Sequence, residues 1–351
     1  MANEDSEKFW LELLSTATKA RATDIHFNDG RISFRVDTDL AVYADIPMPI
    51  YNQHVMYLAN RDIAKAHIKG EVGAADFAST IGDTRLRVNI YRAIAGLTAA
   101  VRMLPKKSFD WQAIGLSQEV VNKINNSQQG LVLITGPTGS GKSSTVCSLI
   151  QMLNENYPYK IITIEDPIEY IFTRKRADIS QREVGEHTDS FASALRSALR
   201  EDPDVIFVGE IRDHETAFVA LHAAETGHLV FSTLHTKRVY NTISTVIEMA
   251  PEARQPEIRS ILAHNLLMVM CQRLMPATGG GITCCREVLM ECPAAAACIT
   301  SKKEKSLVNV MQSGRAQGMI DWNSALQNFV KEEIITPEVA KFFRDTSDDL
   351  Q

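Results

Sequence analysis

The segment LVLITGPTGSGKS, residues 131–143, constrains this chain more than any other. An apolar run ends at Thr135, and the pattern G-x-x-x-x-G-K-[ST] follows from Gly136 to Ser143. We expect the apolar run to form a buried strand and residues 144–153 to form a helix, so that the glycines occupy the turn between them. A turn of this kind directs backbone N–H groups at an anion, as in the phosphate loop of nucleotide-binding proteins.

The motif assigns a part to each of its polar residues. The side chain of Lys142 reaches the outer two phosphates of ATP, and the hydroxyl of Ser143 is a ligand for Mg²⁺. The alternative is a glycine-rich turn that merely begins a helix, and it is disfavoured because every motif residue and both flanking patterns are present. The predicted ATP-binding residues are Gly136, Pro137, Thr138, Gly139, Ser140, Gly141, Lys142, Ser143 and Ser144.

Composition narrows the class of protein. The 351 residues are 45% hydrophobic and 23% charged, which is ordinary for a globular protein of two or three domains. A formal net charge of −6 argues against a broad nucleic-acid-binding surface, so we expect no direct nucleic-acid binding. No apolar run approaches the length that spans a bilayer, and the start MANEDSEKFW lacks the pattern of a secretion signal. We therefore expect a cytoplasmic protein with at most a peripheral membrane role.

Four of the six cysteines fall within residues 284–298, in the spacing C-C-x6-C-x5-C. A zinc site would be favoured by paired C-x-x-C motifs, which this spacing does not contain. Residues 286–290, REVLM, also have the apolar character of a strand. Reduced thiols that are buried or incidental are therefore favoured over a metal site.

The apolar pattern divides the chain into two parts. In the first, residues 7–20 predict an amphipathic helix, and the alternation in residues 31–36 and 84–91 predicts strands. A helix at about 51–68 and a strand at 96–104 complete a small α+β domain over residues 1–104. The polar, proline-marked segment 105–112 is the predicted linker to a second domain, residues 113–351.

Short apolar strands alternate with helices in the second domain, which predicts a parallel sheet covered by helices on both faces. We expect helices beyond residue 240, among them one whose apolar face includes Leu262, Leu266 and Met270. A turn at residues 278–281 precedes the cysteine-bearing strand, and amphipathic helices end the chain. The predicted strands are residues 131–135, 161–164, 205–208 and 229–233, and the last helices are residues 322–330 and 337–343.

Charged residues follow the predicted strands at the edge where parallel sheets bind ligands. Hydrolysis of ATP requires a carboxylate near the attacking water, and either Glu165 or Glu210 could supply it; Glu210 also suits the metal side. The pattern does not rank these two acids. His228 and His235 bracket the strand at 229–233, and we expect both near the nucleotide if that strand neighbours the strand that leads into the phosphate loop.

Four segments together resemble the signature boxes of the secretion-superfamily ATPases, in the PilT/DotB-like branch. They are GPTGSGKSS (136–144), IITIEDPIEY (161–170), LREDPDVIFVGEIRD (199–213) and AAETGHLVFSTLHT (223–236). The resemblance implies a small PAS-like α+β N-terminal domain followed by a RecA-like ATPase domain with C-terminal helices. It also implies a homohexameric ring motor, peripheral to the inner membrane, that energises a type IV pilus or type IV secretion machine.

The resemblance further implies partners and additional site residues. The partners would be an inner-membrane platform protein, which the ring would push or rotate, and other pilus or secretion machine components. Arg87 and Arg102 would approach the triphosphate, whereas a further arginine of the PilT-like pattern is replaced here by Ala95, with Arg92 nearby. Two alternatives stay open: a RecA-like nucleic-acid motor, and a nucleotide-gated assembly scaffold with little hydrolysis.

Overall fold

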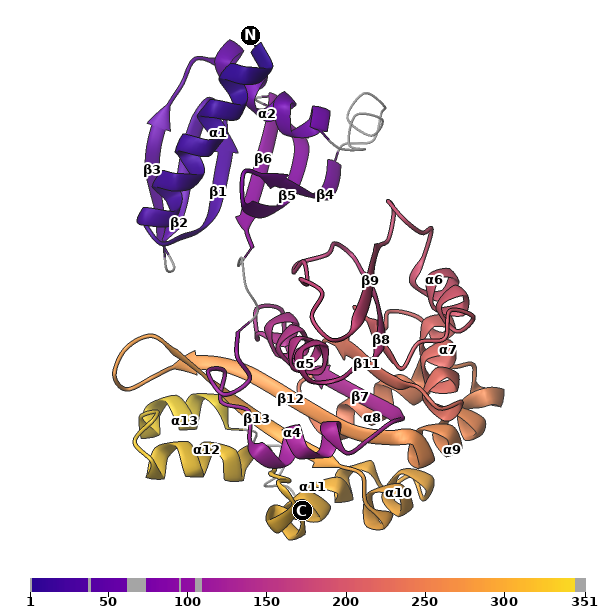
Figure 1. Ribbon diagram of the computed structural model, residues 1–351. Coiled ribbons are helices and arrows are strands. Elements are labelled where there is room, and N and C mark those ends of the chain that lie inside the picture. The colour runs from indigo at the N-terminus through magenta and orange to yellow at the C-terminus, as the bar shows by residue number, and fades with distance from the viewer. Residues whose placement is uncertain (1, 37–38, 62–73, 95, 105–108, 345–351) are drawn as a thin grey trace. The chain divides into compact units, whose positions relative to one another are not determined.

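The computed structural model describes residues 2–36, 39–61, 74–94, 96–104 and 109–344 (Figure 1). The chain folds into two compact units, residues 1–107 with 167–171 and residues 108–166 with 172–351. Ala95, residues 62–68 of the helix predicted at 51–68, and residues 105–108 of the predicted linker lie outside the described residues. No helix in the described ranges is long and apolar enough to cross a bilayer.

The first unit is an antiparallel six-stranded sheet in the order β3-β2-β1-β6-β5-β4, with two helices packed on one face (Figure 1). Helix α1 buries Trp10, Leu13, Leu14 and Ala17, the face that the sequence predicts. The bounds are α1 (Ala2–Lys19), β1 (Ala22–Asn28), β2 (Arg31–Val36), β3 (Asp39–Asp45), α2 (Met48–Arg61), β4 (Ala74–Ile81), β5 (Thr84–Ala93) and β6 (Gly96–Met103).

The second unit is built on a seven-stranded sheet in the order β13-β12-β7-β11-β10-β8-β9. Strands β7 to β12 run parallel to their neighbours, and β13 is antiparallel to β12. The strand bounds are β7 (Gly130–Thr135), β8 (Lys160–Glu165), β9 (Asp178–Glu183), β10 (Val205–Val208), β11 (Leu229–Leu234), β12 (Leu266–Pro276) and β13 (Ile282–Met290).

Helices cover both faces of this sheet, as predicted. Parallel crossovers are right-handed, and the connection from β7 to β8 runs across the sheet in the opposite direction to those from β9 to β10, β10 to β11 and β11 to β12. Helix α5 therefore lies on one face, and α8 and α9 lie on the other (Figure 1). The helix bounds are α4 (Gln118–Asn125), α5 (Lys142–Asn156), α6 (Phe191–Ala198), α7 (His214–Glu225), α8 (Val239–Glu248), α9 (Gln255–Asn265), α10 (Pro293–Thr300), α11 (Leu307–Ser313), α12 (Trp322–Lys331) and α13 (Pro337–Phe343).

The prediction of a helix that includes Leu262, Leu266 and Met270 is wrong for its C-terminal half. Helix α9 ends at Asn265, and residues 266–276 form strand β12, which lies between β7 and β13. Residues 266–272 are all buried, so the segment is apolar on both faces, and such a run does not distinguish a strand from a buried helix. The correction is important for the site because β12 is a direct neighbour of the strand that leads into the phosphate loop.

The last two helices pack against the hairpin of β12 and β13. Trp322, Ala325 and Leu326 of α12 form a small core with Met275 and Cys285 of the hairpin. The guanidinium carbon of Arg273 lies 4.8 Å from the centre of the Trp322 ring, a cation–π contact that adds to this packing. Both helices have the bounds that the sequence predicts, to within one residue.

Candidate nucleotide-binding site

The phosphate loop lies between β7, which is fully buried, and α5, which begins at Lys142. Gly136 has φ of 144°, and a Cβ atom there would lie 2.2 Å from the backbone oxygen of Gln272, so only glycine fits. Gly141 caps α5 with φ of 84°. The N–H groups and dipole of this fifteen-residue helix then face the loop, which suits an anionic phosphate chain.

Gln272 braces the loop from β12. Its side-chain Nε2 donates a hydrogen bond to the backbone oxygen of Ser140 at 2.7 Å, and its Oε1 accepts one from Thr145 Oγ1 at 3.0 Å. Gln272 is fully buried, so these bonds form away from water and fix the loop to the first turn of α5. Sequence reasoning missed this residue, although a lone glutamine in the apolar run LLMVMCQ is a signal that it has a buried partner.

We expect Gln272→Leu to lower the free energy of unfolding by about 1–3 kcal/mol and to weaken ATP binding about tenfold. The substitution leaves the Thr145 hydroxyl and the Ser140 carbonyl unpaired in the interior and releases the loop. Thermal denaturation and a nucleotide titration would measure the two effects. The control is Gln255→Leu, which removes a half-buried bond to the Ala250 oxygen and should leave ATP affinity unchanged. Wild-type ATP affinity in folded Gln272→Leu would refute the bracing role.

Charged side chains form a ladder across the neighbouring strand ends. Lys142 Nζ lies 3.5 Å from His235 Nδ1, and His235 Nε2 lies 3.0 Å from Glu210 Oε1. Arg212 Nε then contacts Glu210 Oε2 at 2.8 Å, and Arg212 Nη1 contacts Asp166 Oδ2 at 3.2 Å. The ladder joins the ends of β7, β11, β10 and β8, so it links the phosphate loop to both acidic segments.

One tautomer of His235 satisfies both of its contacts. Nδ1 accepts a hydrogen bond from the Lys142 ammonium, and Nε2–H donates one to Glu210. The Lys142 ammonium also donates to the backbone oxygens of Gly136 and Pro137, at 2.9 and 3.2 Å. Partial burial opposes the charge on Arg212, but its hydrogen bond to Glu210 and the charges of Glu210 and Asp166 raise its pKa overall, which keeps it cationic.

Glu165 ends β8, and its side chain contacts Thr163 and Gln181. Its buried carboxylate accepts hydrogen bonds from Thr163 Oγ1 at 2.6 Å and Gln181 Nε2 at 3.3 Å. Because β11 and β10 separate β8 from β7, Glu165 lies about three strand spacings, or about 14 Å, across the sheet from β7. The geometry therefore brings Glu210, rather than Glu165, into contact with the residues around the phosphate loop.

The sequence predicts that His228 and His235 both lie near the nucleotide. Within a single chain this is wrong for His228, which lies far from the phosphate loop. Strand β11 does neighbour β7, with Leu229 opposite Gly130 and Leu234 opposite Thr135. His228 precedes the strand, so it lies at the amino edge of the sheet, about 20 Å along the strand from His235. Its Nδ1 lies 2.9 Å from the Ala223 oxygen, which ties it to the end of α7.

Arg87 and Arg102 lie opposite each other on β5 and β6 of the first unit. Leu86 and Val88 point into the core on either side of Arg87, so the arginines lie on the sheet face away from α1 and α2. Arg87 Nη2 contacts Asp76 Oδ2 at 2.9 Å, and Arg102 Nε contacts Asp24 Oδ1 at 2.8 Å. These carboxylates offset the repulsion between two like charges on neighbouring strands.

The cysteines are free thiols. Burial, as the main cause, raises the pKa of Cys271 and of Cys285 to about 12, so both are protonated at neutral pH. Within the described part of the chain, no three side chains of metal-binding type are grouped to hold an ion.

The fold and this site define a P-loop ATPase of the RecA-like class. The family described as "Type II/IV secretion system protein" matches residues 3–335, and the chain belongs to that family.

Relatives and solved structures agree with this assignment. The type IV pilus retraction ATPase PilT of Pseudomonas aeruginosa is 37% identical over 332 residues, covering 94% of this chain and 96% of that protein. The crystal structure of the pilus retraction motor PilT with bound ADP matches at TM-score 0.87 with 38% identity, covering 97% of this chain and 98% of that one. The ATPase DotB of Legionella pneumophila matches at TM-score 0.79 with 25% identity, covering 95% and 94%.

Proposed function

We propose that this chain is an ATP-driven motor of a type IV pilus or type IV secretion machine. The observation that carries the proposal is the ladder from Lys142 through His235 to Glu210, which joins a phosphate loop to a carboxylate able to activate water. The descriptions of the relatives and of the family support both machines, because PilT is described as a pilus retraction motor and the matching family as Type II/IV secretion system proteins. Scoring surface pili against DNA or protein transfer after deletion in the native host would distinguish retraction from secretion.

The residues divide the chemistry among them. Backbone N–H groups of residues 136 and 138–144 hold the phosphates, since Pro137 has no N–H to donate, and Lys142 neutralises the outer two. Glu210 orients and deprotonates the attacking water, and His235, held between Lys142 and Glu210, senses the terminal phosphate. Glu165 is assigned to a supporting role, because it ends β8, about three strand spacings across the sheet from the strand that leads into the phosphate loop.

The site also fits Mg²⁺. The Ser143 hydroxyl, in the first turn of α5, and the Glu210 carboxylate are oxygen donors of the kind that this ion prefers. When bound, Mg²⁺ would supply positive charge to the outer phosphates during transfer. Ser143 and Glu210 are the residues that we assign to hold it.

Motion in this proposal comes from the first unit. Arg87 is partly exposed and Arg102 is exposed, and their guanidinium groups can neutralise charge on the departing phosphate, so hydrolysis would be coupled to closure of the first unit on the second. Six chains would form a ring on the cytoplasmic face of the inner membrane. The ring would push or rotate a platform protein of the machine.

We expect Arg87→Ala to slow ATP turnover at least about tenfold while the protein stays folded. The Arg87–Asp76 pair is substantially exposed, and such pairs contribute only about 0–1 kcal/mol to stability. The matched control is Arg31→Ala, which breaks another exposed arginine–aspartate pair, with Asp45, in the same unit. Steady-state turnover and thermal denaturation would be measured for both, and wild-type turnover in Arg87→Ala would remove this residue from the site.

Specific ATPase activity measured against protein concentration tests the proposal. A ring enzyme gains activity per chain as it assembles, and sizing of the same samples should show a hexamer at the active concentrations. Turnover that is negligible at every concentration would favour a nucleotide-gated scaffold. Strong, salt-sensitive stimulation by DNA would favour a nucleic-acid motor instead.

A further inference from the structure

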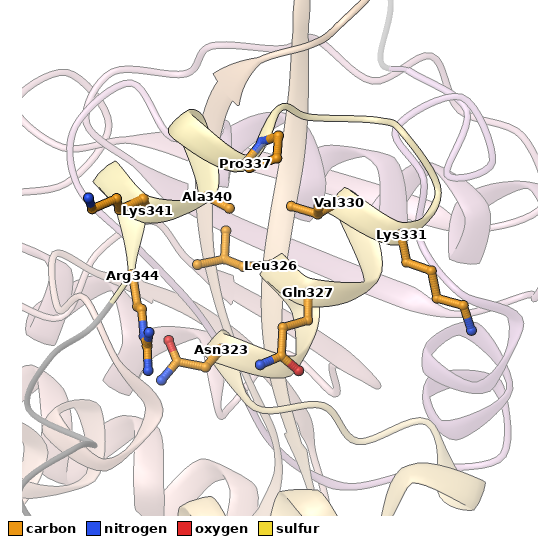
Figure 2. A pocket seen from close by; sticks show the side chains of 9 residues that line it. All are labelled: Asn323, Leu326, Gln327, Val330, Lys331, Pro337, Ala340, Lys341 and Arg344. Atoms are coloured by element: carbon orange, nitrogen blue, oxygen red, sulfur yellow. The ribbon is translucent and has the colours of Figure 1, made fainter.

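The two C-terminal helices leave an apolar groove between them, with a volume of about 390 Å³. Figure 2 shows Leu326, Val330 and Ala340 in the middle of the groove, with Lys331 and Lys341 on opposite sides of it. Leu326 is buried, and Val330 and Ala340 are half-buried. The complete lining is Asn323, Leu326, Gln327, Val330, Lys331, Pro337, Ala340, Lys341 and Arg344.

The spacing of the lining residues is that of a helix-packing face. On α12 they recur at i, i+3, i+4, i+7 and i+8 from Asn323, and on the α13 segment they recur at i, i+3, i+4 and i+7 from Pro337. A stripe with this period is what one helix presents to another. The adjoining face of α12, with Trp322 and Ala325, already packs on the β12–β13 hairpin, and Leu326 belongs both to that core and to the groove lining. The two stripes therefore resemble two sides of a three-helix seam.

The charge of the groove restricts which kind of helix can pack against α12 and α13. Lys331 and Lys341 are exposed, and neither has a carboxylate at ion-pair distance within residues 109–344. No aspartate or glutamate of the described chain lines the groove. An occupant with carboxylates beside its apolar stripe would pair with the lysines, whereas a basic occupant would be repelled.

We propose that the α12–α13 groove binds an amphipathic helix of a partner protein, with large apolar residues at i, i+3, i+4 and i+7 and with acidic residues flanking them. The α12 stripe extends for about 12 Å from Asn323 to Lys331, so about two turns of the partner helix fill the groove. This is the helix-in-groove mode of peptide recognition. The inference stands on the groove alone and does not depend on the proposed motor function.

Two synthetic peptides of about sixteen residues test the groove by fluorescence anisotropy against the full chain. Both carry leucine at i, i+3, i+4 and i+7; one has glutamates beside the stripe, and its sibling has lysines in their place. We expect saturable binding of the acidic peptide and at least tenfold weaker binding of the basic one. The double substitution Lys331→Glu with Lys341→Glu should reverse this preference, whereas the exposed control Lys305→Glu should not. ATP turnover of the double variant should equal that of the wild type.

Three results would overturn the proposal. Equal affinity for both peptides, or an acidic-peptide affinity that the double substitution leaves unchanged, would show that the groove does not select by charge. Peptide binding only after deletion of residues 345–351, which include Asp345, Asp348 and Asp349, would assign the groove to the chain's own acidic end. Sedimentation with phosphatidylglycerol vesicles in the absence of peptide binding would assign it to a membrane surface.

Discussion

Replacement of Lys142 by alanine is expected to reduce ATP turnover at least about a hundredfold. The ammonium is the only side-chain cation of the motif itself, and loss of one preorganised group that stabilises transition-state charge costs about 10²–10³ in rate. Two bonds to the Gly136 and Pro137 oxygens are lost as well, so the loop also becomes less rigid. Steady-state phosphate release with saturating Mg·ATP would measure the effect.

Two further variants make the Lys142 result specific. Lys123→Ala removes a half-exposed lysine of the same unit that pairs with Glu291, and it should turn over ATP at the wild-type rate. Lys142→Arg keeps the charge but changes its shape, and it should recover little activity because a guanidinium cannot replace a compact ammonium in the loop. If Lys142→Ala retained more than half of wild-type turnover, the phosphates would not be bound in the way described.

Glu210→Gln is expected to lower turnover about 10²–10⁴-fold while ATP affinity changes less than about threefold. The substitution keeps the size of the side chain and removes the carboxylate that would take the proton from water, and general-base catalysis contributes rate enhancement of this order. Arg212 and His235 still have a carbonyl oxygen to contact, so the ladder is weakened rather than dismantled. A single-turnover experiment beside an equilibrium titration separates the two quantities.

The control for Glu210→Gln is Glu215→Gln, which alters an exposed glutamate that pairs with Arg196. It should leave both turnover and ATP affinity unchanged. Loss of ATP binding in Glu210→Gln would show that this carboxylate holds the nucleotide rather than the water, and turnover near the wild-type rate would return Glu165 to consideration as the base.

The phosphate loop and the ends of its neighbouring strands can be predicted because their signals are local. Glycines at fixed spacing, a buried run before them and a helix after them specify the loop without any knowledge of distant contacts. Glu210 and His235 follow apolar strands, and parallel strands bring their carboxyl ends to one edge. The same rule places His228 at the opposite edge, because it precedes its strand, so the sequence does contain the signal that excludes it.

Strand order, by contrast, depends on long-range packing. Whether Glu165 or Glu210 lies nearer the phosphate loop is decided by the order β7-β11-β10-β8, which no local pattern encodes. The pattern predicts helix for the first part of strand β12 because an apolar run buried on both faces has no period to read, and the role of Gln272 is hidden with it. The exposed edge strand β3 also escapes prediction, because a strand with little buried surface shows little apolar alternation.

The central claim is that backbone amides and Lys142 hold ATP at the carboxyl edge of a parallel sheet. Calorimetric titration of the full chain with Mg²⁺ and a slowly hydrolysed ATP analogue tests it most directly. The account predicts saturable binding at one site per chain, strongly weakened in Lys142→Ala and retained in Glu210→Gln. Absence of binding to the wild-type chain, or equal binding by Lys142→Ala, would contradict it.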